Sequence, residues 1–322
     1  MLNLVRKSEF AVTAVQPARG GARFFHRDLS LAAFFRRVLE EGQNDRLPLL
    51  ERLKFLAILS SNLDEFFMVR VPRLKEKRDA PQSIDREGLS FGQVLSEVRR
   101  RVIELTDLQA ECLTSEIIPA LRARGVDVAD LRDLDEEESD SVERYFESQI
   151  GPVLTAQAVD PTHPFPYISN GSLNIGLFVR AELPAKVAKT MGVGCEEFFV
   201  SIEIPSFLPR FVPVEGSEHK YVPIEQVITA NIAKIAPAAK ESDCHLFRLT
   251  RDAAIELRES ESVDLVETMK ENLKERRFGG VERLEIAASA PAVMVEYLKE
   301  QLELDEDAIY FTRGPMNIAD FW

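Results

Sequence analysis

Hydrophobic residues recur at helical spacing between residues 48 and 70, where they form two stripes. The first stripe advances in steps of three and four, with a serine in its one gap: Leu49, Leu53, Leu56, Ser60, Leu63 and Phe67. The second stripe lies beside it: Phe55, Ile58, Leu59, Phe66 and Val69. A helix that is apolar on more than one face belongs inside a protein. The pattern therefore predicts a buried helix early in the chain.

One polar cluster, residues 60–62, interrupts this helical pattern. Asn62 falls within the second stripe, seven residues after Phe55 and four before Phe66. A buried amide must find hydrogen-bond partners or cost about 1–3 kcal/mol. We expect those partners to come either from the protein or from a ligand.

The polar side chains next to Asn62 have two explanations. Ser61 and Asp64 have a spacing like that of a capping box, which predicts that one helix is interrupted and another starts here. Asp64 and Glu65 are alternatively a carboxylate pair that could bind Mg²⁺. The pattern favours the cap.

Helical spacing continues to about residue 150, and short connections favour antiparallel neighbours. The further predicted helices cover residues 31–41, capped by Ser30 and ended by Gly42, residues 91–124, ended by Gly125, and residues 135–150. We predict an N-terminal all-α helical bundle over residues 23–125. Residues 1–22 mix charged residues with proline and glycine and have no continuous apolar core, so we expect a disordered tail there.

The pattern changes in the second part of the chain, where strands and helices mix. Predicted strands cover residues 173–179, 198–204, 245–250, 281–286 and 308–311. Predicted helices cover residues 222–235, 263–276 and 292–304. Such an arrangement is typical of an α+β domain with a mixed sheet, which we assign to residues 126–322.

The composition narrows the class of protein. The chain has 322 residues, 45% hydrophobic and 29% charged, as expected of a globular protein with about two domains. Its formal net charge of -14 disfavours binding of nucleic acid, which needs a basic surface. No apolar run approaches the ~18 residues of a transmembrane segment. The three cysteines, Cys112, Cys195 and Cys244, show no metal-ligand spacing and favour a reducing, cytoplasmic location.

Motif and spacing arguments predict no catalytic residue and no metal site. The chain has no phosphate-binding glycine loop, no nucleophile elbow and no zinc-protease motif. The four histidines lie in separate segments: His26, His163, His219 and His245. The basic residues between 70 and 78 either attract phosphate or form a solvated helix end. The run Arg99-Arg100-Arg101 predicts a solvated helix face.

Several segments, in order along residues 23–322, resemble the long bacterial type of the polyphosphate kinase family. The matching segments are Phe25–Ser30, Leu49–Ile58 with Ser60–Arg70, His163–Asn170 with Ser172–Asn174, Leu208–Phe211, Thr250–Asp252, Arg277–Gly279 with Arg283–Glu285, and Gly314–Asp320. The sequence departs from the family where Asn, Glu and Trp are usual, at His26, Asp28 and Leu31. These departures suggest a divergent member.

The resemblance implies an enzyme that transfers the terminal phosphate of ATP reversibly to inorganic polyphosphate through a phosphohistidine. The family has an N-terminal helical domain, a head (middle) domain and two C-terminal catalytic domains, and the resemblance covers only the first two. We therefore expect the C-terminal catalytic domains, the phosphorylated histidine and the Mg²⁺ ligands of the complete enzyme to be absent from this chain. The isolated chain is expected to be inactive, and its head domain to mediate contact between subunits of a homo-oligomer.

One functional position carries over from the family to this sequence. The asparagine of the Ser-Ser-Asn-Leu-Asp-Glu-Phe signature contacts the adenine of ATP in the family, and it stands here at Asn62. An amide offers a donor and an acceptor, which suits an adenine edge. The alternative for Asn62 is a cap at a helix interruption. The alternative for the chain is a non-catalytic, stand-alone interaction or dimerisation module.

Overall fold

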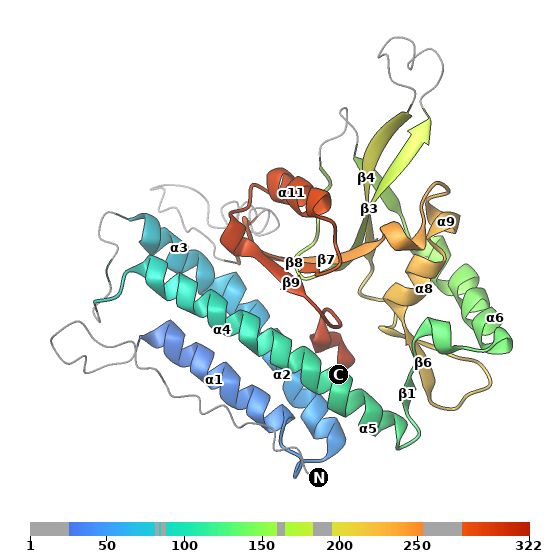
Figure 1. The fold of residues 1–322 in the computed structure, drawn as a ribbon, viewed down its shortest axis with the longest axis horizontal. Coiled ribbons are helices and arrows are strands. Elements are labelled where there is room, and N and C mark those ends of the chain that lie inside the picture. Colours follow the sequence, from blue (N-terminus) through green and yellow to red (C-terminus); the bar gives the residue numbers. More distant parts are fainter. Residues whose placement is uncertain (1–25, 81–83, 85–87, 160–164, 183–194, 254–278) are drawn as a thin grey trace, which may run out of the picture.

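The computed structural model describes residues 26–80, 84, 88–159, 165–182, 195–253 and 279–322. Long helices lie on one side of the molecule and a strand-rich part lies on the other (Figure 1). The predicted fold class, an all-α bundle followed by an α+β part with a mixed sheet, is confirmed. The predicted tail (1–22) and the predicted helix 263–276 lie outside the described residues.

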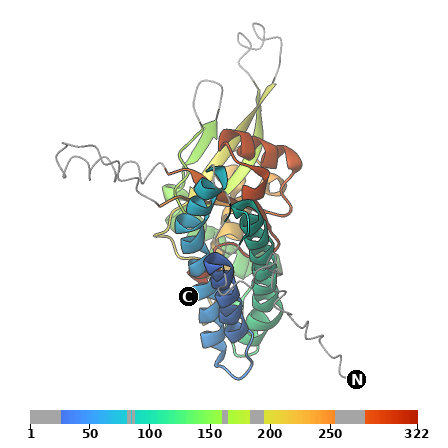
Figure 2. The ribbon, with the colours of Figure 1, turned by 90° about the vertical axis from the view of Figure 1, so that its left-hand side faces the viewer.

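The helical part consists of α1 (Arg27–Gly42), α2 (Leu49–Val69), α3 (Val71–Asp79), α4 (Phe91–Cys112) and α5 (Ile118–Arg122). A π-helical turn, Leu113–Ile117, joins α4 to α5. Helix α1 packs along both α2 and α4, and Figures 1 and 2 show these helices side by side. Their shared core confirms the two stripes in part, since it contains most of their members: Leu53, Leu56, Leu59, Leu63, Phe66 and Phe67.

The predicted helix interruption at residues 60–62 is wrong. Helix α2 runs without a break from Leu49 to Val69. The hydroxyl of Ser61 donates to the carbonyl of Ala57 at 3.2 Å, one turn back in the same helix. A serine that bonds its own helix in this way fits a helix interior. Ser61 and Asp64 therefore form no capping box.

The start of α1 also differs from the prediction. The helix begins at Arg27, and the ring of His26 accepts a hydrogen bond from the backbone N–H of Asp28 at 3.2 Å. Ser30 lies inside the helix, about one turn after the cap position. The imidazole nitrogen does here what a serine oxygen usually does, which the sequence preference for serine could not reveal. The predicted end at Gly42 is confirmed.

A six-stranded mixed sheet organises the second part, with strand order β2-β4-β3-β7-β8-β9. Its strands are β2 (Ala156–Val159), β4 (Cys195–Ile204), β3 (Leu173–Glu182), β7 (His245–Arg251), β8 (Val281–Ala287) and β9 (Ile309–Thr312). Neighbours are antiparallel except β8 and β9, which are parallel. A smaller sheet has the order β1 (Asp127–Val128), β6 (Lys220–Pro223), β5 (Phe211–Pro213).

Within the described residues, four α-helices accompany the sheets: α6 (Glu136–Tyr145), α8 (Ile224–Ala230), α9 (Ile232–Ile235) and α11 (Ala292–Gln301). All five predicted strands are present. The unpredicted strands β1, β2, β5 and β6 have only two to four residues, too few to show an alternating pattern. The predicted helix 222–235 is wrong at its start, because Val222 pairs in β6, and it is divided at Asn231.

The two faces of the large sheet have different chemistry where β7 and β8 pair. One face carries apolar residues that pack with α11: Phe247, Leu249, Leu284 and Ile286. The residues between them on the two strands are Arg248, Thr250, Arg283 and Glu285, which alternate onto the opposite face. Helix α2 lies against this polar face. The helical part therefore meets the sheet over buried charged side chains.

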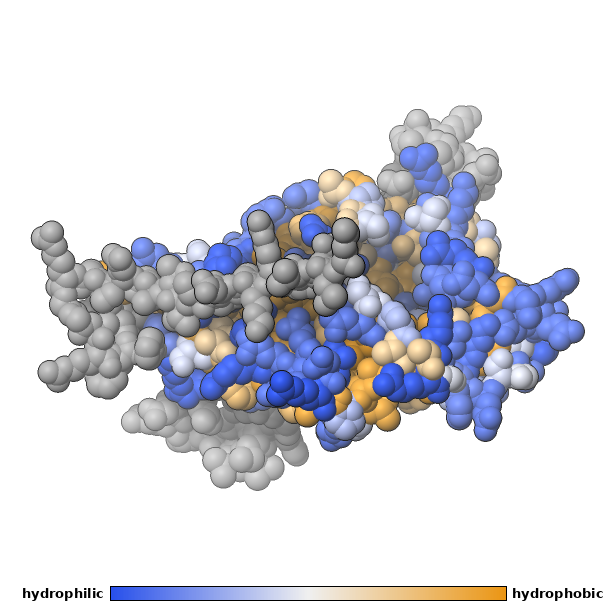
Figure 3. Space-filling model, turned by 60° about the horizontal axis from the view of Figure 1, so that its bottom comes forward, coloured by the Kyte–Doolittle hydropathy of each residue, from blue (hydrophilic) through white to orange (hydrophobic). Residues whose placement is uncertain are grey.

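No helix in the described parts of the chain is long and apolar enough to cross a membrane. Hydrophilic residues cover much of the face shown in Figure 3, and hydrophobic residues show through mainly toward its middle.

Candidate functional site

Asn62 lies in the interior of α2 and is half-buried. Its neighbours one turn away on the same face of the helix are Ile58, which is 38% exposed, and the buried Phe66. Among the described residues, the structure gives the Asn62 side chain no hydrogen-bond partner. The amide is therefore placed at the edge of the apolar core, with both its donor and its acceptor available.

Asp64, two residues further along α2, joins the helix to the sheet. Nη1 of Arg248 donates to Oδ1 of Asp64 at 2.8 Å and Nη2 donates to Oδ2 at 2.5 Å. Nη2 of Arg283 also donates to Oδ1, at 2.6 Å. Asp64, which the sequence pairs with Ser61 in a predicted capping box, is instead the centre of an ion-pair network between two parts of the fold.

Glu285 completes this network on the sheet side. Its carboxylate lies 2.9 Å from Nη1 of Arg248 and 3.0 Å from Nη2 of Arg283. Glu285 stands directly opposite Arg248 in the pairing of β7 with β8, so the register of the two strands brings the charges together. We call Asp64, Arg248, Arg283 and Glu285 the charge cluster, and it balances two positive against two negative side chains.

The two arginines of the charge cluster are deeply buried. The Arg283 side chain is 2% exposed and that of Arg248 is 7% exposed. Burial disfavours the charged form of Asp64, but hydrogen bonds and charges from the two arginines outweigh it and hold the pKa of this carboxyl below its ordinary value. Burial likewise opposes the charge of Arg248, yet Asp64 and Glu285 raise its pKa. Removal of one member would leave a buried charge without its partner.

Each arginine of the charge cluster is also held by a neutral acceptor. Nε of Arg248 donates to the carbonyl of Gly171 at 2.9 Å, and Nη2 of Arg283 donates to the hydroxyl of Thr250 at 2.9 Å. The Arg283 guanidinium further lies over the ring of Phe67, 4.3 Å from its centroid. Phe67 follows Asp64 by one helical turn, so Arg283 contacts the same face of α2 twice.

Two more contacts fix α2 along its length. The buried Gln109 of α4 donates to the carbonyl of Leu56 at 2.7 Å and to the hydroxyl of Ser60 at 2.9 Å. Near the end of the helix, the carbonyl of Met68 accepts from the backbone N–H of Ala253 at 2.9 Å. The polar position Ser60 is therefore paired within the protein, whereas Asn62 has no partner in the part of the chain that the structure describes.

The last residues of the chain also pack on α2. Ile318 belongs to the core of the helical part, and Figure 1 places the C-terminal end beside the helices. An ideal Cβ on Gly314 would lie 2.7 Å from the Cβ of Ala110 in α4, so glycine allows a close approach of the chain to the helix here. Arg210 binds both Glu225 and the carbonyl of Met316, which holds this segment from the other side.

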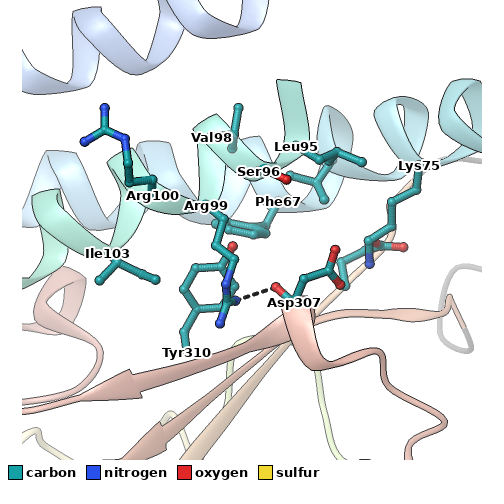
Figure 4. Close-up of a pocket in the computed structure, with 12 residues that line it drawn as sticks. Phe67, Lys75, Leu95, Ser96, Val98, Arg99, Arg100, Ile103, Asp307 and Tyr310 are labelled. Atoms are coloured by element: carbon teal, nitrogen blue, oxygen red, sulfur yellow. Dashed lines mark hydrogen bonds and ion pairs between the residues drawn. The ribbon is translucent and has the colours of Figure 1, made fainter. Parts of the chain in front are cut away.

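A cavity of about 320 Å³ separates α3 and α4 from β8 and β9 (Figure 4). Arg99 of α4 reaches across it, lies over the ring of Tyr310 at 4.7 Å from the centroid, and donates to the carbonyl of Asp307 at 2.5 Å. Lys75 of α3 pairs with Glu282 at 2.8 Å in the same cavity wall. Burial raises the pKa of Glu282 although Lys75 opposes this rise. Asn62 does not line this cavity.

These contacts revise the interpretation of the basic segments. Arg99 and Arg101 are not part of a solvated face: Arg99 holds the sheet part, and Arg101 donates to the carbonyl of Leu29 at 3.0 Å. Only Arg100 of the three is largely exposed, at 58%. Lys75 is paired across the two parts of the fold, so the basic run of residues 70–78 is not wholly a solvated helix end.

The other candidate residues do not assemble into a site. Asp64 is occupied by two arginines and Glu65 is exposed, so the alternative Mg²⁺ pair is wrong. In the described ranges, no three His, Cys, Asp or Glu side chains lie close enough to hold a metal ion. Burial lowers the pKa of His245, while His163 lies outside the described residues. The sequence analysis missed Arg248 and Glu285 in the network around Asp64. Charged residues that alternate with apolar residues in the predicted strands 245–250 and 281–286 could have indicated a charged sheet face.

Two protein-family descriptions match this chain in sequence. "Polyphosphate kinase N-terminal domain" matches residues 24–129, and "Polyphosphate kinase middle domain" matches residues 137–322.

Individual polyphosphate kinases are similar over nearly the whole chain. The protein of Synechocystis is 40% identical over 313 residues, which are 94% of this chain and 42% of the relative. The proteins of Bacillus anthracis and Streptomyces coelicolor are 35% and 36% identical, over 92% and 93% of this chain and 42% and 39% of the relatives. The chain thus spans about two fifths of the length of these relatives.

The fold is also similar to a solved structure. The crystal structure of polyphosphate kinase from Porphyromonas gingivalis matches with a TM-score of 0.72 and 21% sequence identity, over 94% of this chain and 41% of that one. This chain therefore has the same overall fold as the matched part of that structure.

Proposed function

This chain belongs to the polyphosphate kinase family, and from that premise we propose that it acts as the N-terminal half of such an enzyme. The complete enzyme transfers the terminal phosphate of ATP to inorganic polyphosphate through a phosphohistidine. The observation that carries the proposal is the ordered match of the N-terminal and middle domains over residues 24–129 and 137–322. In this proposal the chain holds the nucleotide base and contacts a second subunit.

The proposed contact with the base is made by Asn62. Its amide is half-buried beside the partly exposed Ile58 and has no hydrogen-bond partner among the described residues. Adenine presents an amino donor next to ring-nitrogen acceptors, and a single amide can pair with one of each. The apolar side chain of Ile58 one turn away offers a surface for the flat face of the ring.

The chain is proposed to be inactive by itself. Phosphoryl transfer needs a nucleophile and positioned charge at the phosphates, and neither is assigned to the residues of this half. Mg²⁺ would neutralise phosphate charge when it is bound with ATP, but the described residues bring together no group of carboxylate, histidine or cysteine ligands that fits it. The proposal therefore assigns no metal ligand to this chain.

Two further parts of the proposal follow from the family. The α+β part mediates association into a homo-oligomer, which sedimentation of the purified chain would detect as a mass above 36.4 kDa. The location is cytoplasmic, because ATP is the phosphate donor. A sedimenting mass of 36.4 kDa at all concentrations contradicts the proposed subunit contact.

Nucleotide binding is tested with the fluorescent analogue trinitrophenyl-ATP and its displacement by ATP. The wild-type chain is expected to bind the probe in an ATP-displaceable manner, and Asn62→Ala is expected to weaken ATP about tenfold. Ser61→Ala is the matched control: Ser61 is adjacent and exposed, and among the described residues its hydroxyl bonds only the carbonyl of Ala57 in its own helix. Absence of displaceable binding up to about 10 mM ATP would favour the non-catalytic interaction module instead.

A further inference from the structure

We propose that Asp64 is a positioning residue for the nucleotide, because its ion pairs with β7 and β8 fix the rotation of α2 and thereby the direction of Asn62. This inference rests on the proposed role of Asn62 in binding the base. It assigns a functional purpose to the charge cluster beyond joining the two parts of the fold.

The two side chains leave α2 on nearly opposite faces. Successive residues of an α-helix are about 100° apart, so Asn62 and Asp64 differ by about 200° in direction and by about 3 Å along the axis. Asp64 points to the sheet, where it meets Arg248 and Arg283. Asn62 therefore points away from the sheet, and any roll of the helix about its axis moves both side chains together.

The charge cluster resists such a roll because its hydrogen bonds are directional. Asp64 accepts three hydrogen bonds from two guanidinium groups, at 2.5–2.8 Å. Bidentate pairs of this kind fix direction as well as distance. The guanidinium groups cannot follow the carboxylate, because Gly171 and Thr250 hold them on the sheet.

The distance by which a roll of α2 would move the Asn62 amide decides whether the roll affects nucleotide binding. Side chains lie about 5–6 Å from the helix axis, so a roll of about 20° would displace the Asn62 amide by about 2 Å. A hydrogen bond to a base edge tolerates only a few tenths of an ångström. Misplacement of about 1 Å can cost a binding or catalytic group most of its effect.

The test is a double-mutant cycle on nucleotide affinity with the 322-residue chain and the trinitrophenyl-ATP probe. Asp64→Asn removes the charge and keeps the shape, and it is combined with Asn62→Ala. We expect Asp64→Asn to weaken ATP about tenfold in the wild-type background and less than about twofold in the Asn62→Ala background. A role in fold stability alone would give the same fold-change in both backgrounds, and that result overturns the inference.

A control variant separates positioning from general loosening of the contact. Lys75→Gln breaks another ion pair between the helical part and β8, that of Lys75 with Glu282, and is expected to leave ATP affinity within about twofold. If Asp64→Asn does not fold by circular dichroism, Arg248→Lys takes its place in the cycle, since it keeps the charge and loses the bidentate geometry. Additive effects of Arg248→Lys and Asn62→Ala then contradict the inference.

The outcome also distinguishes the two proposals. If Asn62→Ala leaves ATP affinity unchanged, the proposed base contact is wrong and this inference is wrong with it. If Asn62→Ala weakens ATP but Asp64→Asn acts additively or has no effect, only the positioning role of Asp64 is rejected.

Discussion

The carboxylate of Asp64 accepts a hydrogen bond from the guanidinium of Arg283 at 2.6 Å, across 219 residues of the chain. This contact crosses from α2 in the helical part to β8, an inner strand of the large sheet. A buried ion pair contributes little net stability compared with an apolar contact of the same size, but it is satisfied in only one geometry. The two parts of the fold are therefore joined in a defined orientation.

The first prediction concerns stability. Arg283→Met should lower the free energy of unfolding by about 3–5 kcal/mol, because Asp64 and Glu285 would then share the single guanidinium of Arg248 in a buried site. Urea denaturation measures the change. Arg313→Met, at an exposed position that forms no ion pair among the described residues, should change the value by less than about 0.5 kcal/mol. Equal changes in the free energy of unfolding for the two variants would contradict a stabilising role of Arg283 in the charge cluster.

The second prediction concerns pH. The folded pKa of Asp64 lies below its ordinary value of 3.8, so the unfolded chain binds this proton more readily. The stabilisation is fully present above pH 3.8 and is lost as the pH falls through the folded pKa. The melting temperature of the wild type should therefore fall more steeply below about pH 4 than that of Asp64→Asn. If the melting temperatures of the two proteins fall equally between pH 5 and pH 3, a range about the ordinary pKa, the ionised form of Asp64 does not stabilise the folded protein.

The hydrophobic pattern was sufficient to predict part of the local structure. The stripes of residues 48–70 predicted α2, and the alternation in residues 281–286 predicted β8, because helical and strand periods follow directly from backbone geometry. The stripe assignment overstated burial for four positions, since Ile58 is 38% exposed and Leu49, Phe55 and Val69 are only partly buried. Periodicity gives the faces of an element but does not say how far a neighbouring element covers each face.

Long-range partners were beyond the reach of local patterns. The spacing of Asp64 from Ser61, three residues before it, predicts a capping box, whereas the partners of Asp64 follow it by 184 and 219 residues. Arg99 was assigned to a solvated face, whereas it binds the carbonyls of Asp307 and Ile309. In both cases the sequence showed a charged side chain at a plausible surface position, and only the packing of the helices on the sheet reveals that the position is covered.

The third prediction concerns the second contact between the helices and the sheet. Arg99→Met should lower the free energy of unfolding by about 1–2 kcal/mol, since it removes two hydrogen bonds to carbonyls and the stacking on Tyr310. Amide hydrogen exchange in β9 should become faster, because Arg99 holds the start of this strand. Arg100→Met, next along α4 and 58% exposed, is the control and should leave exchange in β9 unchanged. Unaltered exchange in both variants would mean that β9 is held by β8 alone.

The fourth prediction asks whether Asn62 uses both its donor and its acceptor. Asn62→Asp keeps an acceptor for the adenine amino group but has no N–H to donate to a ring nitrogen, and it adds a negative charge near an anionic ligand. ATP should therefore bind about tenfold more weakly to this variant than to the wild type, measured by displacement of trinitrophenyl-ATP.

Glu65→Gln is the matched control, because Glu65 lies one turn further along the same face and is exposed. Its loss of negative charge should leave ATP affinity equal or slightly higher. Wild-type affinity in Asn62→Asp would show that the amide donates no hydrogen bond to the base, and the proposed contact would then have to be made through the oxygen alone.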